Sequence, residues 1–204
     1  MTSRRKKRLP ARFHVTAVLL LLVPVCLFAA LCIGVAMDET TEQIYNRFYP
    51  LKYTALVELA AERWDIPSSV IFGVIHTESG FDENALSHAG AVGLMQMTDD
   101  TYEWIYFLRR EECPPHDTMS IPAYNIDAGA FLLSWLYKQY GNWATVYAAY
   151  NAGYARVNKW LEDPEISEGG VLVHIPINET EQYVKRCTEA EEIYRTVYGE
   201  ILGE

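Results

Sequence analysis

The residue best suited to carry chemistry in this chain is Glu78, a carboxyl at the end of an apolar helical run. It follows Val74 by four residues and Ile75 by three, so a helix would place the three side chains on one face. Burial and the partial negative charge at a helix C-terminus both raise the pKa of such a carboxyl. A carboxylic acid that stays protonated near neutral pH can donate a proton to a glycosidic oxygen. From this pattern alone, a carboxyl turned to solvent or bonded to nearby backbone is the simpler interpretation.

Segments rich in glycine and amides follow this acid and change that interpretation. Ser79-Gly80 would end the helix just after Glu78, and residues 85–96 hold two glycines where a large ligand could approach the backbone. Gln96 offers amide donors and a carbonyl acceptor, which suit sugar hydroxyl and acetamido groups. Tyr150-Asn151 adds an aromatic edge and an amide at the end of a second expected helix, just before Gly153. Each of these motifs alone is a weak indication of a glycan site. Their joint order along the chain is more specific than any single motif.

The order and spacing of these motifs resemble the catalytic domain of the soluble lytic transglycosylases, which belong to the goose-type lysozyme superfamily. The resemblance extends over about residues 50–195. The matching residues are Glu78-Ser79-Gly80-Phe81, Ala85, Ser87, Gly90-Ala91, Gly93-Leu94-Met95-Gln96, Asn125-Ile126, Gly129, Ala149-Tyr150-Asn151-Ala152-Gly153, Ile175-Pro176, Glu179-Thr180 and Tyr183-Val184.

The resemblance implies a mainly α, lysozyme-like fold with a groove for a glycan strand of peptidoglycan. The family cuts the β-1,4 bond between N-acetylmuramic acid and N-acetylglucosamine, and no metal or other cofactor is implied. Glu78 matches the catalytic acid, whereas Thr98 stands where some members have an apolar residue. The predicted substrate-binding residues are Ser87, Gln96, Tyr150, Asn151 and Glu179, together with Met95, whose side chain is expected in the core.

Only Glu78 is expected to act as a catalytic carboxyl, although most glycosidases use two. We expect Glu78 to protonate the leaving oxygen and then to take the proton of the muramic C6 hydroxyl, closing a 1,6-anhydro ring without water. Asp82 and Glu83 are expected in a solvated turn, and Ser87 fits a turn as well as a sugar subsite. The alternatives are a hydrolytic muramidase, a non-catalytic glycan-binding scaffold in an envelope assembly, and a membrane-anchored helical adaptor whose motif residues only pack.

Residues 13–37 carry no Asp, Glu, Lys or Arg and predict one N-terminal transmembrane helix. Twenty-five residues at about 1.5 Å each exceed the roughly 30 Å hydrocarbon core. The basic residues within 1–12 place the N-terminus in the cytoplasm, a connector covers 38–50, and the catalytic domain (51–204) lies outside the cell membrane. A cleaved signal peptide is the alternative, although its apolar core usually spans about 7–15 residues.

The net charge of −10 is unevenly distributed along the chain. Residues 1–37 hold six of the 17 bases and none of the 27 acids, so the remainder carries a net charge of −16. Nucleic-acid binding is therefore not expected, because it needs clustered Lys and Arg. Cys113 and Cys187 would lie outside the membrane, where a disulfide is permitted, and the sequence leaves their pairing open.

Apolar residues recur at helical spacing through most of the outer part, and no segment shows sustained period-two alternation. Ser68 or Asp65 is expected to cap the helix that carries Glu78, and Thr98 the next one. A short strand is expected at 171–173, within a loop over 163–178. The expected helices span about 52–64, 68–78, 98–108, 122–140, 143–150, 154–161 and 179–198.

Overall fold

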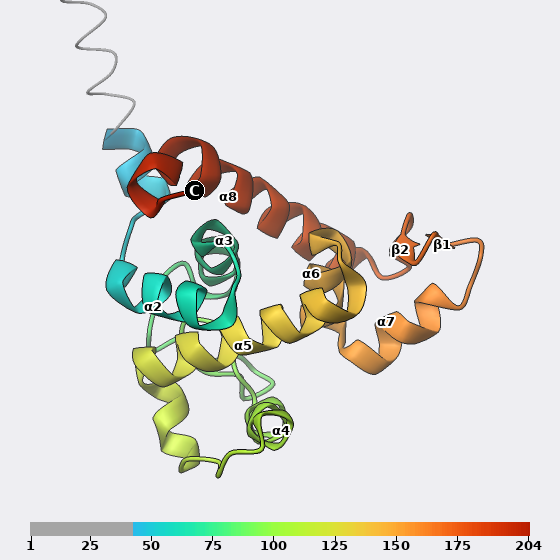
Figure 1. Cartoon of the computed structure of the whole chain (residues 1–204), viewed down its shortest axis with the longest axis horizontal. Coiled ribbons are helices and arrows are strands. Elements are labelled where there is room, and N and C mark those ends of the chain that lie inside the picture. The colour runs from blue at the N-terminus through green and yellow to red at the C-terminus, as the bar shows by residue number, and fades with distance from the viewer. Residues whose placement is uncertain (1–42) are drawn as a thin grey trace, which may run out of the picture. The chain divides into compact units, whose positions relative to one another are not determined.

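A computed structural model describes residues 43–204 of the chain (Figure 1). Residues 43–48 form a short helix, and Leu51–Glu204 forms a separate compact unit. The predicted membrane anchor at 13–37 lies outside the described residues. Over 43–204, the structure contains no helix that is both long and apolar enough to cross a bilayer.

The unit Leu51–Glu204 consists of seven α-helices, one 3-10 helix and one two-stranded hairpin, which confirms the prediction of a mainly α domain. The elements are α2 (Thr54–Trp64), α3 (Ser68–Ser79), α4 (Asp99–Arg109), η1 (His116–Ser120), α5 (Pro122–Tyr140), α6 (Trp143–Ala152), α7 (Tyr154–Leu161), β1 (Ser167–Glu168), β2 (Val171–Leu172) and α8 (Asn178–Leu202).

Local signals account for several helix ends. Thr98 caps α4, because its side chain accepts a hydrogen bond from the Thr101 amide at 3.3 Å. Pro122 opens α5, and Gly141 ends it in the left-handed conformation at φ 64°. These three positions agree with the sequence prediction.

The predicted cap of α3 is wrong. Asp65 instead ends α2, at φ 54°, and α3 begins after Pro67 without a side-chain cap. Because Pro67 fixes the last extended position, Ser68 and Ser69 become the buried first turn of the helix. The backbone amide of Ser69 donates to Oε1 of Glu204, 135 residues away in sequence, at 3.0 Å. A tertiary contact thus replaces the local cap.

The segment after α7 contains a hairpin rather than one strand. Ser167 pairs with Leu172 and Glu168 with Val171, in antiparallel register. The predicted strand is confirmed at 171–172, and its partner β1 was not predicted. Cys113 and Cys187 are both free thiols, so the disulfide that the sequence left open is not formed.

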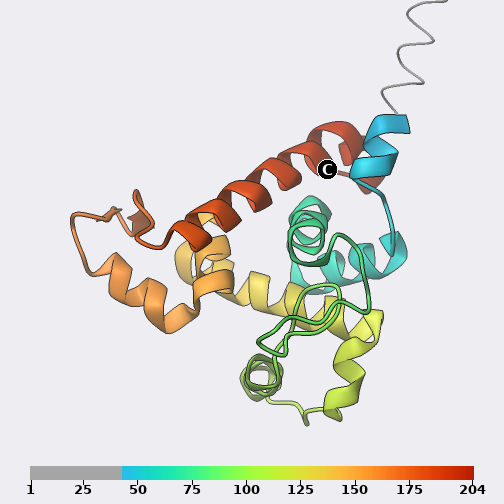
Figure 2. The same ribbon diagram turned by 180° about the vertical axis from the view of Figure 1, so that it is seen from behind.

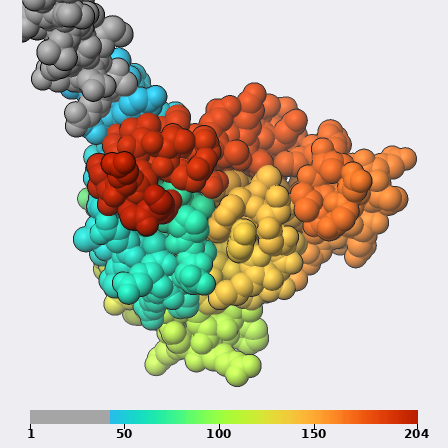
Figure 3. Space-filling view, turned by 45° about the horizontal axis from the view of Figure 1, so that its top comes forward, coloured from blue at the N-terminus to red at the C-terminus, as the bar shows by residue number. Residues whose placement is uncertain are grey.

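Helix α3 forms the centre of the fold, and its residues from Ser68 to Ile75 are buried. It packs mainly against α8, which also lies along α6 (Figures 1 and 3). Seen from behind, the loop between α3 and α4 crosses in front of α5 (Figure 2).

Gly73 allows the backbones of α3 and α8 to approach each other closely. A Cβ atom at this position would lie 2.9 Å from the backbone nitrogen of Glu191 and 3.3 Å from the carbonyl oxygen of Cys187. Backbone atoms of a packed helix cannot turn aside as a flexible side chain can. The packing of the two helices therefore requires glycine at position 73.

We expect Gly73→Ala to lower the free energy of unfolding by about 1–3 kcal/mol, because the added methyl overpacks the contact with α8. Gly199→Ala in α8 is the matched control, since its Cβ would come no closer than 3.4 Å to the Glu204 carbonyl oxygen. Higher helix propensity should leave this control neutral or stabilised by up to about 1 kcal/mol. Denaturant unfolding measures both variants, and equal stabilities would contradict the assigned role of Gly73.

Candidate active site

Glu78 is partly buried in the last turn of α3 and pairs with a tyrosine of α8. Its Oε1 accepts a 2.7 Å hydrogen bond from the hydroxyl of Tyr183, which is buried. Burial raises the pKa of Glu78 from 4.5 to about 7, although the Tyr183 hydrogen bond and the charge of Arg186 act to lower it. Near neutral pH this carboxyl therefore exists in both protonation states, as an acid that later acts as a base requires.

The two acidic residues just after α3 make contacts of their own. Oδ1 of Asp82 accepts from the Asn84 amide at 3.0 Å, and Oε2 of Glu83 accepts from the Tyr53 hydroxyl at 3.0 Å. Both side chains are exposed, as expected for a solvated turn. Among the described residues, the groups that shift the pKa of Glu78 include no second carboxyl.

Asn125 of α5 holds the loop between α3 and α4 in place. Its buried side-chain oxygen accepts from the Met95 amide at 2.7 Å, and its Nδ2 donates to the carbonyl oxygens of Val92 and Met119 at 3.0 and 2.7 Å. Gly93 leaves room for this amide, because a Cβ there would lie 2.5 Å from Nδ2. The sequence placed Asn125 in a motif but gave it no role.

The end of α3 is tied to the same loop. The hydroxyl of Ser79 donates to the Leu94 carbonyl oxygen at 2.8 Å. This bond fixes the loop relative to Glu78, one residue earlier. The loop residues predicted to bind sugar are therefore held at a defined position beside the acid.

Ser87 and Gln96 are partly exposed residues of this loop. Gln96 adopts φ 51°, and its Nε2 donates to the carbonyl oxygens of Ala85 and Gly93 at 3.2 and 3.0 Å. Its donors are thus used within the loop, and its side-chain oxygen remains available as an acceptor. The Ser87 hydroxyl accepts from the Ala91 amide at 3.0 Å, so this residue stabilises a turn.

Met95 lies in the core, and Tyr150 connects it to the site. The Met95 side chain is fully buried, and a Cβ at Gly129 would lie 2.4 Å from its sulfur. The hydroxyl of Tyr150 donates to the Met95 carbonyl oxygen at 2.9 Å. Burial, followed by the nearby charge of Glu78, holds the pKa of Tyr150 well above its usual value. Tyr150 is therefore a neutral hydrogen-bond donor beside the acid.

Asn151 and Glu179 lie where α6 ends and α8 begins, and both side chains are exposed. Oδ1 of Asn151 accepts a 2.8 Å hydrogen bond from the hydroxyl of Thr180, which is 2% exposed. The structure thus pairs Glu78 with Tyr183, places Tyr150 close enough for the charge of Glu78 to affect it, and joins Asn151 to α8 through Thr180. Sequence reasoning assigned no role to Tyr183 or Thr180, although their three-residue spacing on one helix was a usable signal.

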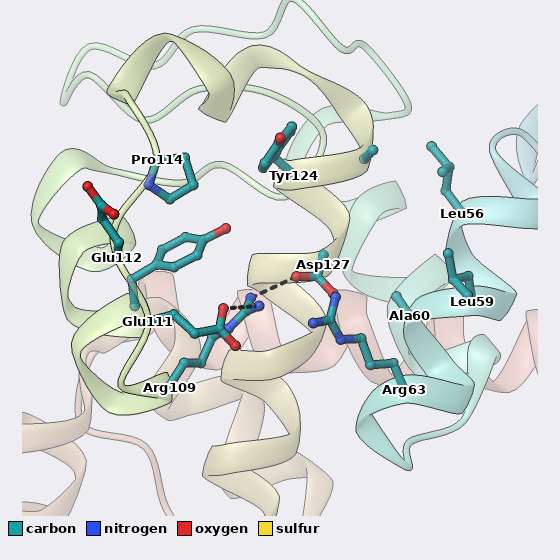
Figure 4. Close-up of a pocket in the computed structure, with 12 residues that line it drawn as sticks. Leu56, Leu59, Ala60, Arg63, Arg109, Glu111, Glu112, Pro114, Tyr124 and Asp127 are labelled. Atoms are coloured by element: carbon teal, nitrogen blue, oxygen red, sulfur yellow. Dashed lines mark hydrogen bonds and ion pairs between the residues drawn. The ribbon is translucent and has the colours of Figure 1, made fainter.

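A cavity of about 450 Å³ lies between α2, α4 and α5, and none of the predicted site residues lines it (Figure 4). Arg109, almost fully buried, pairs there with Asp127 at 2.7 Å, and Arg63 pairs with the same carboxylate at 3.1 Å. These ion pairs join the three helices. In the described part of the chain, no group of three or more His, Cys, Asp or Glu residues could hold a metal ion.

Glu78 and the site residues up to Asn151 lie in a segment that matches a known family, and the site residues of α8 follow it. Residues 55–169 match the transglycosylase SLT domain, and the chain belongs to this family. It is 30% identical over 158 residues to the soluble lytic murein transglycosylase of Escherichia coli strain K12, covering 74% of this chain and 24% of that protein. It is 36% identical over 118 residues to the membrane-bound lytic murein transglycosylase C of Haemophilus ducreyi, covering 53% of this chain and 32% of that protein.

Solved structures of two such proteins share the fold. The lytic transglycosylase Slt of Pseudomonas aeruginosa, an inactive mutant, aligns with a TM-score of 0.67 and 30% identity over 76% of this chain and 26% of its own. The 70 kDa soluble lytic transglycosylase in complex with bulgecin A aligns with a TM-score of 0.69 and 30% identity over 79% of this chain and 26% of its own. The expected lysozyme-like helical domain is confirmed. The chain spans about a quarter of the length of these relatives.

We expect Glu78→Gln to stabilise the fold at and above neutral pH. Folding raises the pKa of Glu78 from 4.5 to about 7, so the native state binds this proton more tightly than the unfolded state. Its contribution to stability is therefore full below pH 4.5 and is lost as the pH rises towards 7. The whole pKa shift corresponds to a change of about 3 kcal/mol in the free energy of unfolding.

Denaturant unfolding of both proteins across this pH range measures the effect. The variant should gain stability over the wild type as the pH rises, and the difference should level off above pH 7. A difference that does not change with pH would show that Glu78 has an ordinary pKa.

Proposed function

We propose that this chain is a peptidoglycan lytic transglycosylase that cleaves the β-1,4 bond between N-acetylmuramic acid and N-acetylglucosamine. The observation that carries the proposal is Glu78, which lies within the matched SLT segment as a partly buried carboxyl with a pKa of about 7, hydrogen-bonded to Tyr183 of α8. The names of the relatives, soluble and membrane-bound lytic murein transglycosylases, support the substrate class.

In the first step, protonated Glu78 donates its proton to the glycosidic oxygen, and the bond from that oxygen to muramic C1 breaks. The substrate's own acetamido group stabilises the positive charge that develops at C1. Glu78 is left as a carboxylate, which the Tyr183 hydroxyl stabilises through the 2.7 Å hydrogen bond.

In the second step, the Glu78 carboxylate takes the proton of the muramic C6 hydroxyl. The C6 oxygen then bonds to C1 and closes a 1,6-anhydro ring. The proton of the C6 hydroxyl restores Glu78 to its protonated form, the first proton leaves on the departing sugar's hydroxyl, and no water is consumed. One carboxyl is sufficient because acid and base act in sequence rather than together.

We assign the sugar contacts to residues whose polar groups face solvent. Gln96 offers its side-chain oxygen to sugar hydroxyl groups, because its amide hydrogens are used in the loop. Ser87, Asn151 and Glu179 complete the proposed side-chain contacts, whereas Tyr150 and Met95 act by shaping the wall of the site.

We further propose that residues 13–37 anchor the enzyme in the cell membrane, with the N-terminus cytoplasmic and the catalytic domain on the outer side. The uncharged segment and its basic flank support this arrangement. The arrangement would keep the SLT domain within reach of the cell wall.

Digestion of purified peptidoglycan by the full-length chain should produce 1,6-anhydromuramic ends, which mass spectrometry detects. Glu78→Gln should lower the rate by about 10²–10⁴-fold, because the proton donor is removed while the shape is kept. Glu83→Gln, which changes an exposed acid in the following turn, should retain activity.

Muramic ends without the anhydro ring would instead identify a hydrolytic muramidase. Glycan binding without any cleavage would identify a scaffold. Retained cleavage by Glu78→Gln would remove Glu78 from the proposed role.

The rate of cleavage should fall as the pH rises through about 7, because the first step needs protonated Glu78. Tyr183→Phe removes a hydrogen bond that favours the carboxylate, so it should raise the pKa of Glu78. The alkaline limb of the profile of kcat/KM against pH should then move to higher pH. A limb that stays in place or moves to lower pH would contradict the assigned pairing.

A further inference from the structure

Thr180 is a buried hydroxyl that contacts an exposed amide of the candidate site. The residue is 2% exposed and lies in the first turn of α8, and its Oγ1 donates to Oδ1 of Asn151 at 2.8 Å. Asn151 lies in the last turn of α6, a helix that packs along α8. A fixed group in the core thus contacts a group that faces solvent.

The two ends of an asparagine amide have nearly the same shape but opposite hydrogen-bonding character. With Oδ1 held by Thr180, the two hydrogens on Nδ2 remain for a partner outside. A flipped amide would leave the hydroxyl hydrogen of Thr180 without this acceptor in a buried position, which is costly. The hydrogen bond therefore selects one of two amide orientations.

Helix α8 also contacts Glu78, the acid at the end of α3. Tyr183, three residues after Thr180, donates to Glu78 at 2.7 Å. Residues at this spacing lie on one face of a helix. The first two turns of α8 therefore fix both the proton donor and the amide donor relative to each other.

We propose that Thr180 is a positioning residue, which orients the Asn151 amide so that Nδ2 donates a hydrogen bond to an oxygen of the glycan. The proposal rests on the proposed function, because it makes Asn151 a contact for the glycan that Glu78 cleaves. It assigns to Thr180 no contact with the substrate.

Kinetics with soluble glycan fragments and the full-length chain test this role. Thr180→Val keeps the shape of the side chain but removes the hydroxyl, and it should raise KM by about 3–10-fold with little change in kcat. Thr180→Ser keeps the hydroxyl and should stay within about twofold of the wild type. A purely structural role would lower the fraction of active enzyme, and so kcat, at unchanged KM. That result would overturn the proposal, as would a loss that Ser does not rescue.

A double-mutant cycle supplies the second test. Asn151→Ala removes the amide, so adding Thr180→Val to it should raise KM no further. Additive increases in KM would show that the two side chains act independently and would overturn the proposal.

Binding measurements separate this proposal from the proposed function. In the Glu78→Gln background, calorimetry reports the affinity for the same glycan fragments without turnover. Thr180→Val should weaken this binding by about the factor found for KM. Unchanged binding would reject the role of Thr180 while leaving the role of Glu78 intact. A chain that does not cleave glycan, but whose glycan binding weakens with Thr180→Val and with Asn151→Ala, would reject the proposed function alone.

Discussion

Close packing of α3 against α8 determines the environment of the acid. With glycine at position 73 the two backbones touch, which brings the Tyr183 hydroxyl to Glu78 and excludes most water from the carboxyl. Burial raises the pKa, and the tyrosine limits that rise. The resulting pKa of Glu78, about 7, is a balance of these opposing effects. It depends on how closely α3 and α8 pack, although Glu78 and Tyr183 are 105 positions apart in the sequence.

The loop between α3 and α4 shows how irregular backbone can be held without regular secondary structure. The buried Asn125 amide takes the place of a neighbouring strand and satisfies one donor and two acceptors of the backbone. Ser79 adds a tie to the helix that carries Glu78. A loop fixed in this way can present Ser87 and Gln96 at a constant position. The entropic cost of ordering the loop when a ligand binds is therefore smaller.

Local sequence predicts the parts of this fold that local physics controls. Thr98, Pro122 and Gly141 mark helix ends because capping and backbone conformation act within a few residues. The cap of α3 was predicted wrongly because the Ser69 amide donates to Glu204, which no local pattern reveals. The motifs identify Glu78, but its bond to Tyr183 and the loss of the Gln96 donors to the loop depend on folding.

The unpaired Cys187 has a consequence if the catalytic domain lies outside the cytoplasm, as proposed above. The thiolate is the form of cysteine that oxidises and exchanges disulfides. Cys187 is fully buried behind Tyr183 and Glu78, and burial raises the pKa of its thiol to about 12. At neutral pH the thiolate is almost absent. The same exclusion of water that raises the pKa of Glu78 would therefore protect a free thiol from oxidation in an oxidising compartment.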